Sequence, residues 1–152
     1  AQGREWNHNQ SLDWHELGNP AHLGMQALVR DLNRVYCATA ALHVNDTRPE
    51  GFMWIMSNDA EAGVYAWARI GRPGDPIVVA VVNMTPVDRS YRLGLPAAGQ
   101  WDEVLNSDAE LYGGGNRGNL GGVLAQAVPH HGQAQSALVS LPPLSAIWFR
   151  QG

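Results

Sequence analysis

The hydrophobic pattern of residues 51–149 is the strongest constraint on the fold. In GVYAWARI (63–70) small apolar residues alternate with Tyr, Trp and Arg, which is typical of a strand with two different faces. IVVAVVNM (77–84) is continuously apolar, as in a central buried strand. About eight such segments at nearly regular spacing predict a mainly β protein, an antiparallel β-sandwich. The segments are 51–57, 63–70, 77–84, 90–95, 100–105, 123–128, 136–141 and 144–149.

A helical pattern precedes the strands. Asn19 and Pro20 favour a helix start, because Asn accepts from free backbone N–H groups and Pro suits the first turn. Beyond them, apolar or small residues at 28, 32, 35, 39 and 42 follow a one-sided helical spacing. We predict one helix from about Ala21 to Val44, ended by the polar run 45–49.

Composition limits the classes of partner. A chain of 152 residues with 45% hydrophobic and 16% charged residues can bury one ordinary core, so we expect one domain with an appendage. The net charge of −4 argues against nucleic acid as a partner, and the lack of a long apolar run argues against a membrane. Cys37 is a single cysteine, which excludes an internal disulfide and fits a reducing compartment, the cytoplasm.

The first 19 residues are predicted to be a loop, in which aromatic and polar side chains alternate. Trp6 and Trp14 stand among amide, carboxylate and imidazole groups, including Asp13. This combination suits a sugar-binding surface, because sugar rings stack on aromatic faces while polar groups bind the hydroxyls. The alternative is that both tryptophans only anchor the loop. Trp101, at the start of a predicted strand, is a further candidate for an exposed sugar-contacting tryptophan.

The glycine-rich stretch YGGGNRGNLGG (112–122) contains a G-x-G-x-x-G spacing at Gly113, Gly115 and Gly118. A dinucleotide site requires a helix after this motif and an acidic residue about 20 positions later. The following residues are strand-like, and no Asp or Glu occurs after Glu110. We therefore expect an ordered excursion between strands, with glycines where the backbone needs positive φ.

Other reactive constellations are absent from the sequence. His130 and His131 are adjacent, so on a strand they would point to opposite faces, and a solvated turn is a better interpretation than a metal site. The carboxylate pairs at 102–103 and 108–110 suit capping or turn roles better than glycoside chemistry. We expect no catalytic residue, no metal and no cofactor in this chain.

Five segments together carry a family resemblance. The chain resembles the carboxyl-terminal part of the bacterial 1,4-α-glucan (glycogen) branching enzymes, which belong to the α-amylase superfamily. The segments are GREWNHNQSLDW (3–14), LVRDLNRVY (28–36), VVNMTPVDRSYRLGLP (81–96), GQWDEVLNSDAELYGGGNRGN (99–119) and LPPLSAIWF (141–149).

The resemblance implies a division of the chain at residue 48. Residues 1–48 would hold the last loop and the last helix of a (β/α)8 catalytic barrel, and residues 49–152 the α-amylase-type C-terminal β-sandwich. The loop containing Trp6, Asp13 and Trp14 would then approach the glucan-binding cleft, since such barrels build their sites from these loops.

The implied reaction is cleavage of α-1,4-glucan and transfer of the freed chain to form α-1,6 branches. The family's catalytic carboxylates would precede Ala1, so we expect this piece to be inactive alone. Its implied partners are α-1,4-glucan or glycogen and the other parts of the same enzyme. Glucan contacts at Trp6, Asp13, Trp14 and Trp101 are expected from aromatic and acidic chemistry and not from a match to the family's motifs. Two alternatives stay open. The chain could be a stand-alone carbohydrate-binding module, or a sandwich that only covers the barrel and leaves an apolar stripe exposed at Leu28, Leu32 and Val35.

Overall fold

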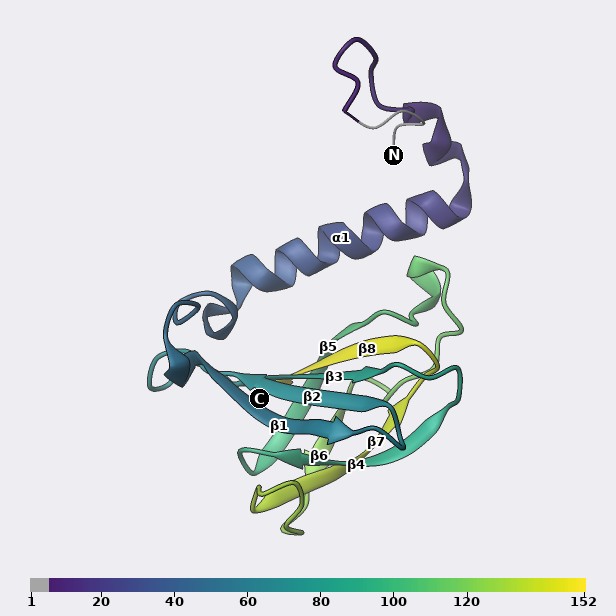
Figure 1. The fold of residues 1–152 in the computed structure, drawn as a ribbon. Coiled ribbons are helices and arrows are strands. Elements are labelled where there is room, and N and C mark those ends of the chain that lie inside the picture. The colour runs from purple at the N-terminus through teal and green to yellow at the C-terminus, as the bar shows by residue number, and fades with distance from the viewer. Residues whose placement is uncertain (1–5) are drawn as a thin grey trace.

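A computed structural model describes residues 6–152 and shows one long helix lying across a β-sandwich (Figure 1). The helical elements are η1 (Trp14–Gly18), α1 (Pro20–Ala38), η2 (Ala40–Leu42), η3 (Pro49–Gly51) and η4 (Glu110–Tyr112). The strands are β1 (Phe52–Asp59), β2 (Val64–Arg69), β3 (Val78–Asn83), β4 (Arg89–Leu95), β5 (Gly99–Asn106), β6 (Gly122–Ala125), β7 (Gln135–Leu141) and β8 (Ser145–Gln151).

The strands form two sheets, and every pairing between them is antiparallel. A six-stranded sheet has the order β1-β2-β3-β8-β5-β6, and a two-stranded sheet pairs β4 with β7. The core fills the space between the sheets, as alternation along each strand requires. Its largest fully buried apolar side chains are Trp101, Phe149, Leu93, Leu95, Leu141 and Ile147. The predicted antiparallel sandwich is confirmed, although the segment expected to run to Val128 ends as a strand at Ala125.

Helix α1 starts as predicted and ends earlier than predicted. The Asn19 side chain accepts a hydrogen bond from the backbone N–H of Ala21 at 3.0 Å, and Pro20 is the first helical residue. The helix stops at Ala38, and η2 follows as a tighter turn. In η2, Ala41 and Leu42 are buried against Val78 of the large sheet. The chain must leave the helix axis to bury them, which is why the regular helix does not reach Val44.

The side of α1 that meets the sandwich differs from a simple apolar stripe. Gly24 and Asp31 are its buried residues, whereas the predicted stripe of Leu28, Leu32 and Val35 is only half-buried. The large exposed apolar side chains of the helix are Leu23, Met25, Val29 and Tyr36. The expectation of an exposed apolar stripe at Leu28, Leu32 and Val35 is therefore wrong, because all three are partly buried. A small and a polar residue make the closest approach, and the exposed apolar side is rotated away from it.

The glycine-rich stretch is an ordered excursion between β5 and β6, as predicted. Gly113 and Gly121 adopt left-handed φ values of 89° and 96°, which favour glycine. The Asp108 carboxylate holds the loop by accepting from the backbone N–H groups of Gly115 at 2.9 Å and Arg117 at 3.0 Å. These bonds satisfy backbone groups of a long loop that has no strand partner.

Candidate functional site

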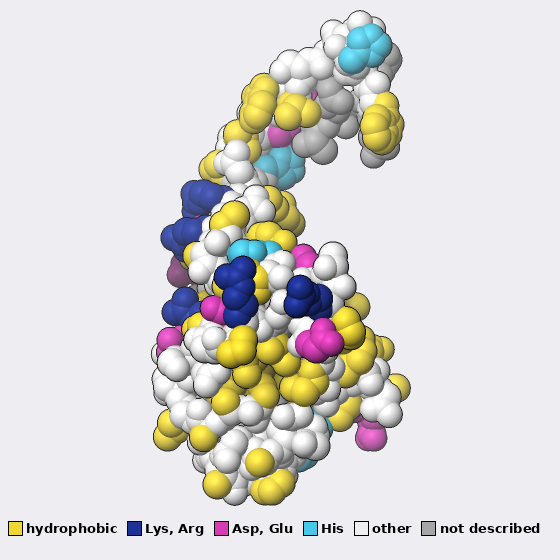
Figure 2. Space-filling view, turned by 90° about the vertical axis from the view of Figure 1, so that its left-hand side faces the viewer, with side chains coloured by type: hydrophobic (Ala, Val, Ile, Leu, Met, Phe, Trp, Pro, Cys, Tyr) yellow, Lys and Arg dark blue, Asp and Glu magenta, His cyan; other side chains and the backbone are white. Residues whose placement is uncertain are grey.

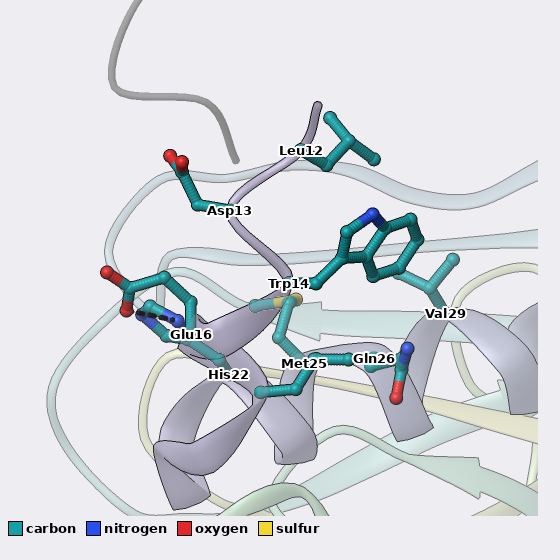
Figure 3. A pocket seen from close by; sticks show the side chains of 9 residues that line it. Leu12, Asp13, Trp14, Glu16, His22, Met25, Gln26 and Val29 are labelled. Atoms are coloured by element: carbon teal, nitrogen blue, oxygen red, sulfur yellow. Dashed lines mark ion pairs between the residues drawn. The ribbon is translucent and has the colours of Figure 1, made fainter. Parts of the chain in front are cut away.

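A pocket of about 500 Å³ lies where η1 meets the first half of α1, on the N-terminal arm of the molecule (Figures 1 and 3). Its lining combines apolar side chains with a polar rim. The lining residues are Leu12, Asp13, Trp14, Glu16, Leu17, His22, Met25, Gln26 and Val29.

Tight backbone turns fold the segment that precedes the helix. The N–H of Trp14 donates to the carbonyl of Leu12 at 2.8 Å, and that of Glu16 donates to the carbonyl of Asp13 at 3.0 Å. The N–H of Asn19 then donates to the carbonyl of Glu16 at 2.9 Å. Asn19 is also the cap of α1, so one residue ends the turn and starts the helix. Residues 1–5 of the predicted loop lie outside the described residues, and within residues 6–19 the short helix η1 (Trp14–Gly18) replaces part of it.

The apolar wall of the pocket consists of Trp14, Met25 and Val29. Met25 and Val29 lie one helical turn apart on the same side of α1, and the Trp14 ring extends along the helix toward Val29 (Figure 3). Trp14 is 61% exposed, Met25 60% and Val29 49%. Such an indole face is available to a sugar ring or to another apolar surface.

The polar rim lies on the other side of the Trp14 backbone. Nδ1 of His22 lies 3.1 Å from Oε2 of Glu16, and Figure 3 shows this pair with the Asp13 carboxylate, away from the Trp14 ring. Both partners of the pair are about half exposed, so water screens their interaction. The rim offers hydrogen-bonding groups, as a surface that binds hydroxyls requires.

The predicted site residues do not all come together. Asp13 and Trp14 line the pocket, and Trp6 is 96% exposed but is not among the lining residues. Trp101 is 0% exposed and lies in the core between the sheets. Its Nε1–H donates to the carbonyl of Ala97 at 3.1 Å, so its polar atom is also satisfied internally. The expectation that Trp101 is an exposed glucan contact is wrong, because its side of β5 faces the small sheet.

An aromatic surface that the sequence interpretation missed lies at the β1–β2 edge of the large sheet. Phe52, Trp54 and Trp67 form this outer-sheet aromatic cluster. The ring centroids of Phe52 and Trp54 are 5.1 Å apart, those of Trp54 and Trp67 are 6.2 Å apart, and both pairs meet edge to face. Trp54 is 53% exposed. Alternation in residues 63–70 places Trp67 opposite the buried alanines of β2, and pairing places Trp54 beside it.

Polar groups border the outer-sheet aromatic cluster. Arg69, which lies opposite Phe52 in the β1–β2 pair, forms an ion pair with Asp46. The hydrogen bond from Arg69 is the largest cause that lowers the pKa of Asp46. Tyr36 also donates to Asp46, at 3.4 Å. Aromatic faces beside fixed polar groups are the arrangement that sugar recognition requires, and pairing of GFMWIMS with its neighbour was the signal for it.

The two adjacent histidines form a turn, as predicted. His130 and Gln133 exchange backbone hydrogen bonds, and Gly132 between them has a φ of 72°. Burial lowers the pKa of His131, and the neighbouring His130 lowers it further. Among residues 6–152 no group of three or more His, Cys, Asp or Glu side chains could hold a metal ion. Within the same residues, no helix combines the length and apolar character that a membrane crossing requires.

The sequence of the chain matches a known domain family and a set of known proteins. Residues 54–152 match the family model described as "Alpha amylase, C-terminal all-beta domain". The chain is 54% identical over 151 residues to a 1,4-alpha-glucan branching enzyme of Jannaschia sp. (strain CCS1), covering 99% of this chain and 21% of that protein. It is 53% identical over 152 residues to the branching enzyme of Cupriavidus necator, covering 99% and 20%. For the branching enzyme of Pseudomonas putida the identity is 51% over 148 residues, covering 97% and 20%.

The chain thus spans about a fifth of the length of the curated relatives it matches. The resemblance to the branching enzymes, predicted from five sequence segments, is confirmed by these identities. The family model covers the whole sandwich except the first two residues of β1. The family model describes an all-β domain, and the observed fold is one. The chain belongs to the α-amylase C-terminal all-β domain family.

Proposed function

We propose that this chain is part of a cytoplasmic 1,4-α-glucan branching enzyme, which cleaves α-1,4-glucan and transfers the freed chain to form α-1,6 branches. One observation carries the proposal: 51–54% identity over 97–99% of the chain to proteins named as branching enzymes. In this proposal residues 1–48 complete the catalytic barrel, and residues 49–152 form the C-terminal sandwich.

The exposed apolar side of α1 is the proposed contact with the barrel. Met25, Val29 and Tyr36 recur at helical spacing and are 42–60% exposed. A different side of the helix, at Gly24 and Asp31, is already covered by the sandwich. A helix with both sides apolar or covered is typical of a helix packed between two bodies.

Glucan contact is proposed for two surfaces. The first is the N-terminal segment, where Trp6, Asp13 and Trp14 combine exposed indoles with polar groups; Met25 and Val29 are assigned to the barrel contact and not to glucan. The second is the outer-sheet aromatic cluster, where Trp54 is the most exposed ring. Hydrophobic side chains gather both on the arm and on the sandwich below it in Figure 2. A long polymer is a ligand that can reach surfaces this far apart.

Three carboxylates of the sandwich, those of Asp59, Glu103 and Asp108, are committed to structural hydrogen bonds, which supports inactivity of the chain alone. Glu103 accepts from the backbone and side-chain N–H groups of Asn119 at 2.9 and 2.8 Å. Asp108 holds the glycine-rich loop, and Asp59 accepts from Ala62 and Tyr91. Retaining glycoside chemistry requires two carboxyl groups that both face a scissile bond, about 5 Å apart. We therefore assign no catalytic residue to these positions.

The test compares the purified chain with the native gene product that contains it. Branching of amylose is followed by the loss of iodine absorbance, and intact mass shows whether the native product exceeds 16.5 kDa. We expect branching by the larger product and none by the 152-residue chain. Branching by the isolated chain would contradict its assignment as a non-catalytic part. A larger native product that binds amylose but never branches it would contradict the branching function.

A stand-alone carbohydrate-binding module is the second candidate. The observation that favours it is the exposure of the outer-sheet aromatic cluster, which belongs entirely to the sandwich. It requires that the chain alone binds glucan and that the native product has the mass of this chain. The intact-mass measurement separates it from the branching enzyme.

A further inference from the structure

Helix α1 is attached to the sandwich at both of its ends. Near its C-terminal end, Val35 packs against a small core formed with η2 and Trp148 of β8. In its first two thirds, the helix contacts Tyr112 of η4, in the glycine-rich loop, through Gly24 and Asp31. The two attachments together fix the direction of the helix, and only the second lies close to the pocket.

Tyr112 makes two different contacts with α1. Its hydroxyl donates to Oδ2 of Asp31 at 2.9 Å, and Asp31 is only 7% exposed. Its backbone packs directly on Gly24, where an added Cβ would collide with the Tyr112 carbonyl oxygen. The helix can approach this closely only because residue 24 has no side chain. The bond from Tyr112 is also the largest cause that lowers the pKa of Asp31, so the carboxylate is held in its charged form.

The loop that presents Tyr112 is itself fixed. The N–H of Tyr112 donates to the carbonyl of Ala109 at 2.9 Å, and Gly113 ends the turn with a φ of 89°. Asp108 precedes η4 and accepts hydrogen bonds from the backbone N–H groups of Gly115 and Arg117, which follow it. Tyr112 therefore has a defined position relative to β5, from which this loop emerges.

We propose that Tyr112 is a positioning residue, and that Tyr112, Asp31 and Gly24 form a clamp that sets the pocket relative to the sandwich. The clamp holds the same two helical turns that carry Met25 and Val29, which belong to the apolar wall of the pocket. Trp14 rests on those turns, so release of the clamp moves the pocket while the sandwich stays folded. The proposal rests on the branching function only where enzyme activity is measured.

The chain contains a matched control for the hydroxyl bond. Tyr91 donates to Oδ2 of Asp59 at 2.8 Å, which is nearly the same geometry, but both residues belong to the sandwich. In hydrogen–deuterium exchange, Tyr112→Phe should speed exchange of amides in residues 20–31 by about fivefold, the factor for one hydrogen bond of ordinary strength. Tyr91→Phe should leave these amides unchanged. Equal effects of the two variants on residues 20–31, or none from Tyr112→Phe, would overturn the clamp.

Substitution of Gly24 tests the clamp in a second way, because helix propensity and the clamp predict opposite changes in the exchange rate. Alanine is a better helix former than glycine, so Gly24→Ala would slow exchange along α1 if the helix made no close contact there. The clamp predicts faster exchange, because the new Cβ pushes the helix away from Tyr112. Gly18→Ala is the control, since a Cβ at Gly18 meets no atom within 4 Å. Slower exchange in Gly24→Ala would contradict the proposed close approach.

The enzymatic arm uses the full-length protein that contains this chain. Tyr112→Phe should raise KM for amylose about three- to tenfold with little change in kcat, because a displaced pocket weakens binding rather than chemistry. Tyr91→Phe should leave KM unchanged. Faster exchange without a change in KM would refute a positioning role for substrate. If the unsubstituted protein shows no branching, the proposed function fails, and the exchange experiments still decide on the clamp.

Discussion

Tyr91 donates a hydrogen bond of 2.8 Å to Oδ2 of Asp59, and this bond links the small sheet to the edge strand of the large one. Asp59 also accepts from the backbone N–H of Ala62 at 3.0 Å. The Ala62 bond is the largest cause that lowers the pKa of Asp59, followed by the Tyr91 bond. Burial is the largest cause that raises the pKa of Tyr91 above its usual range. The pair therefore makes the stability of the fold depend on pH in both acid and base.

Acid should destabilise the chain through this pair. A carboxylate with a lowered pKa stabilises the fold above its unfolded pKa, about 3.9 for Asp, and the stabilisation is lost as pH falls through the folded value. Asp31 and Asp46 also have lowered pKa values and contribute to the same loss of stability in acid. We expect urea midpoints to fall steeply below about pH 4. Asp59→Asn should be less stable at pH 7 and should show a shallower acid limb. An unchanged slope in this variant would contradict the assignment.

Base should act on the other partner. The raised pKa of Tyr91 means that its stabilisation is complete below the unfolded value, about 10 for Tyr, and is lost as pH rises toward the folded value. Tyr91→Phe should reduce the free energy of unfolding by about 0.5–1.5 kcal/mol at pH 7. It should also flatten the decline in stability above pH 10. Urea unfolding followed between pH 7 and pH 11 measures both effects.

Removal of Trp54 should weaken glucan contact without unfolding the sandwich. Because Trp54 is 53% exposed, Trp54→Ala removes an exposed ring rather than a core residue. Loss of one stacked ring should weaken binding by up to about tenfold, because ring stacking contributes about 0.5–1.5 kcal/mol. Affinity electrophoresis in glycogen measures the change. Leu138→Ala is the control, because Leu138 is 57% exposed but lies on the small sheet. Equal retardation of the Trp54 variant and the parent would exclude this surface.

Charge on the exposed side of α1 should prevent association through that side. Met25 and Val29 present an apolar surface that favours self-association of the isolated chain. Met25→Lys combined with Val29→Lys should keep the chain monomeric at concentrations where the parent associates, as sedimentation velocity would show. The same double substitution in the full-length protein should lower its melting temperature if this side contacts the barrel. No effect in the full-length protein would argue that the side is free there.

Trp101 should be a residue of stability. Trp101→Phe removes the hydrogen bond to Ala97 and leaves a void in the core, so we expect a loss of about 2 kcal/mol in the free energy of unfolding. Trp14→Phe, at an exposed position, should change it by less than about 0.5 kcal/mol. Urea denaturation followed by circular dichroism compares the two. A smaller loss for the Trp101 variant than for the Trp14 variant would contradict the burial of Trp101.

The period of the hydrophobic pattern was sufficient to predict the sandwich, since each strand has its own local signal. Alternation in residues 63–70 even predicted two different faces for β2, and Ala66 and Ala68 are indeed buried. The exposure predicted for Trp101 of β5 was wrong. Trp101 faces the small sheet, whereas Leu105, four residues later, pairs with Trp148 after an irregularity in register. Both are buried on either side of this irregularity, so alternation along β5 could not indicate which side was exposed.

Helix α1 and its start were likewise predictable from Asn19, Pro20 and the apolar spacing, because capping and periodicity are local. Its orientation was not. Tyr112, which meets Asp31 across 81 positions of sequence, decides which side of the helix is covered. The strands, the start of the helix and the family could be predicted from the sequence, because their signals lie in neighbouring residues. The exposure of each tryptophan and the contact of the glycine-rich loop with the helix could not, because they depend on contacts between segments far apart in the chain.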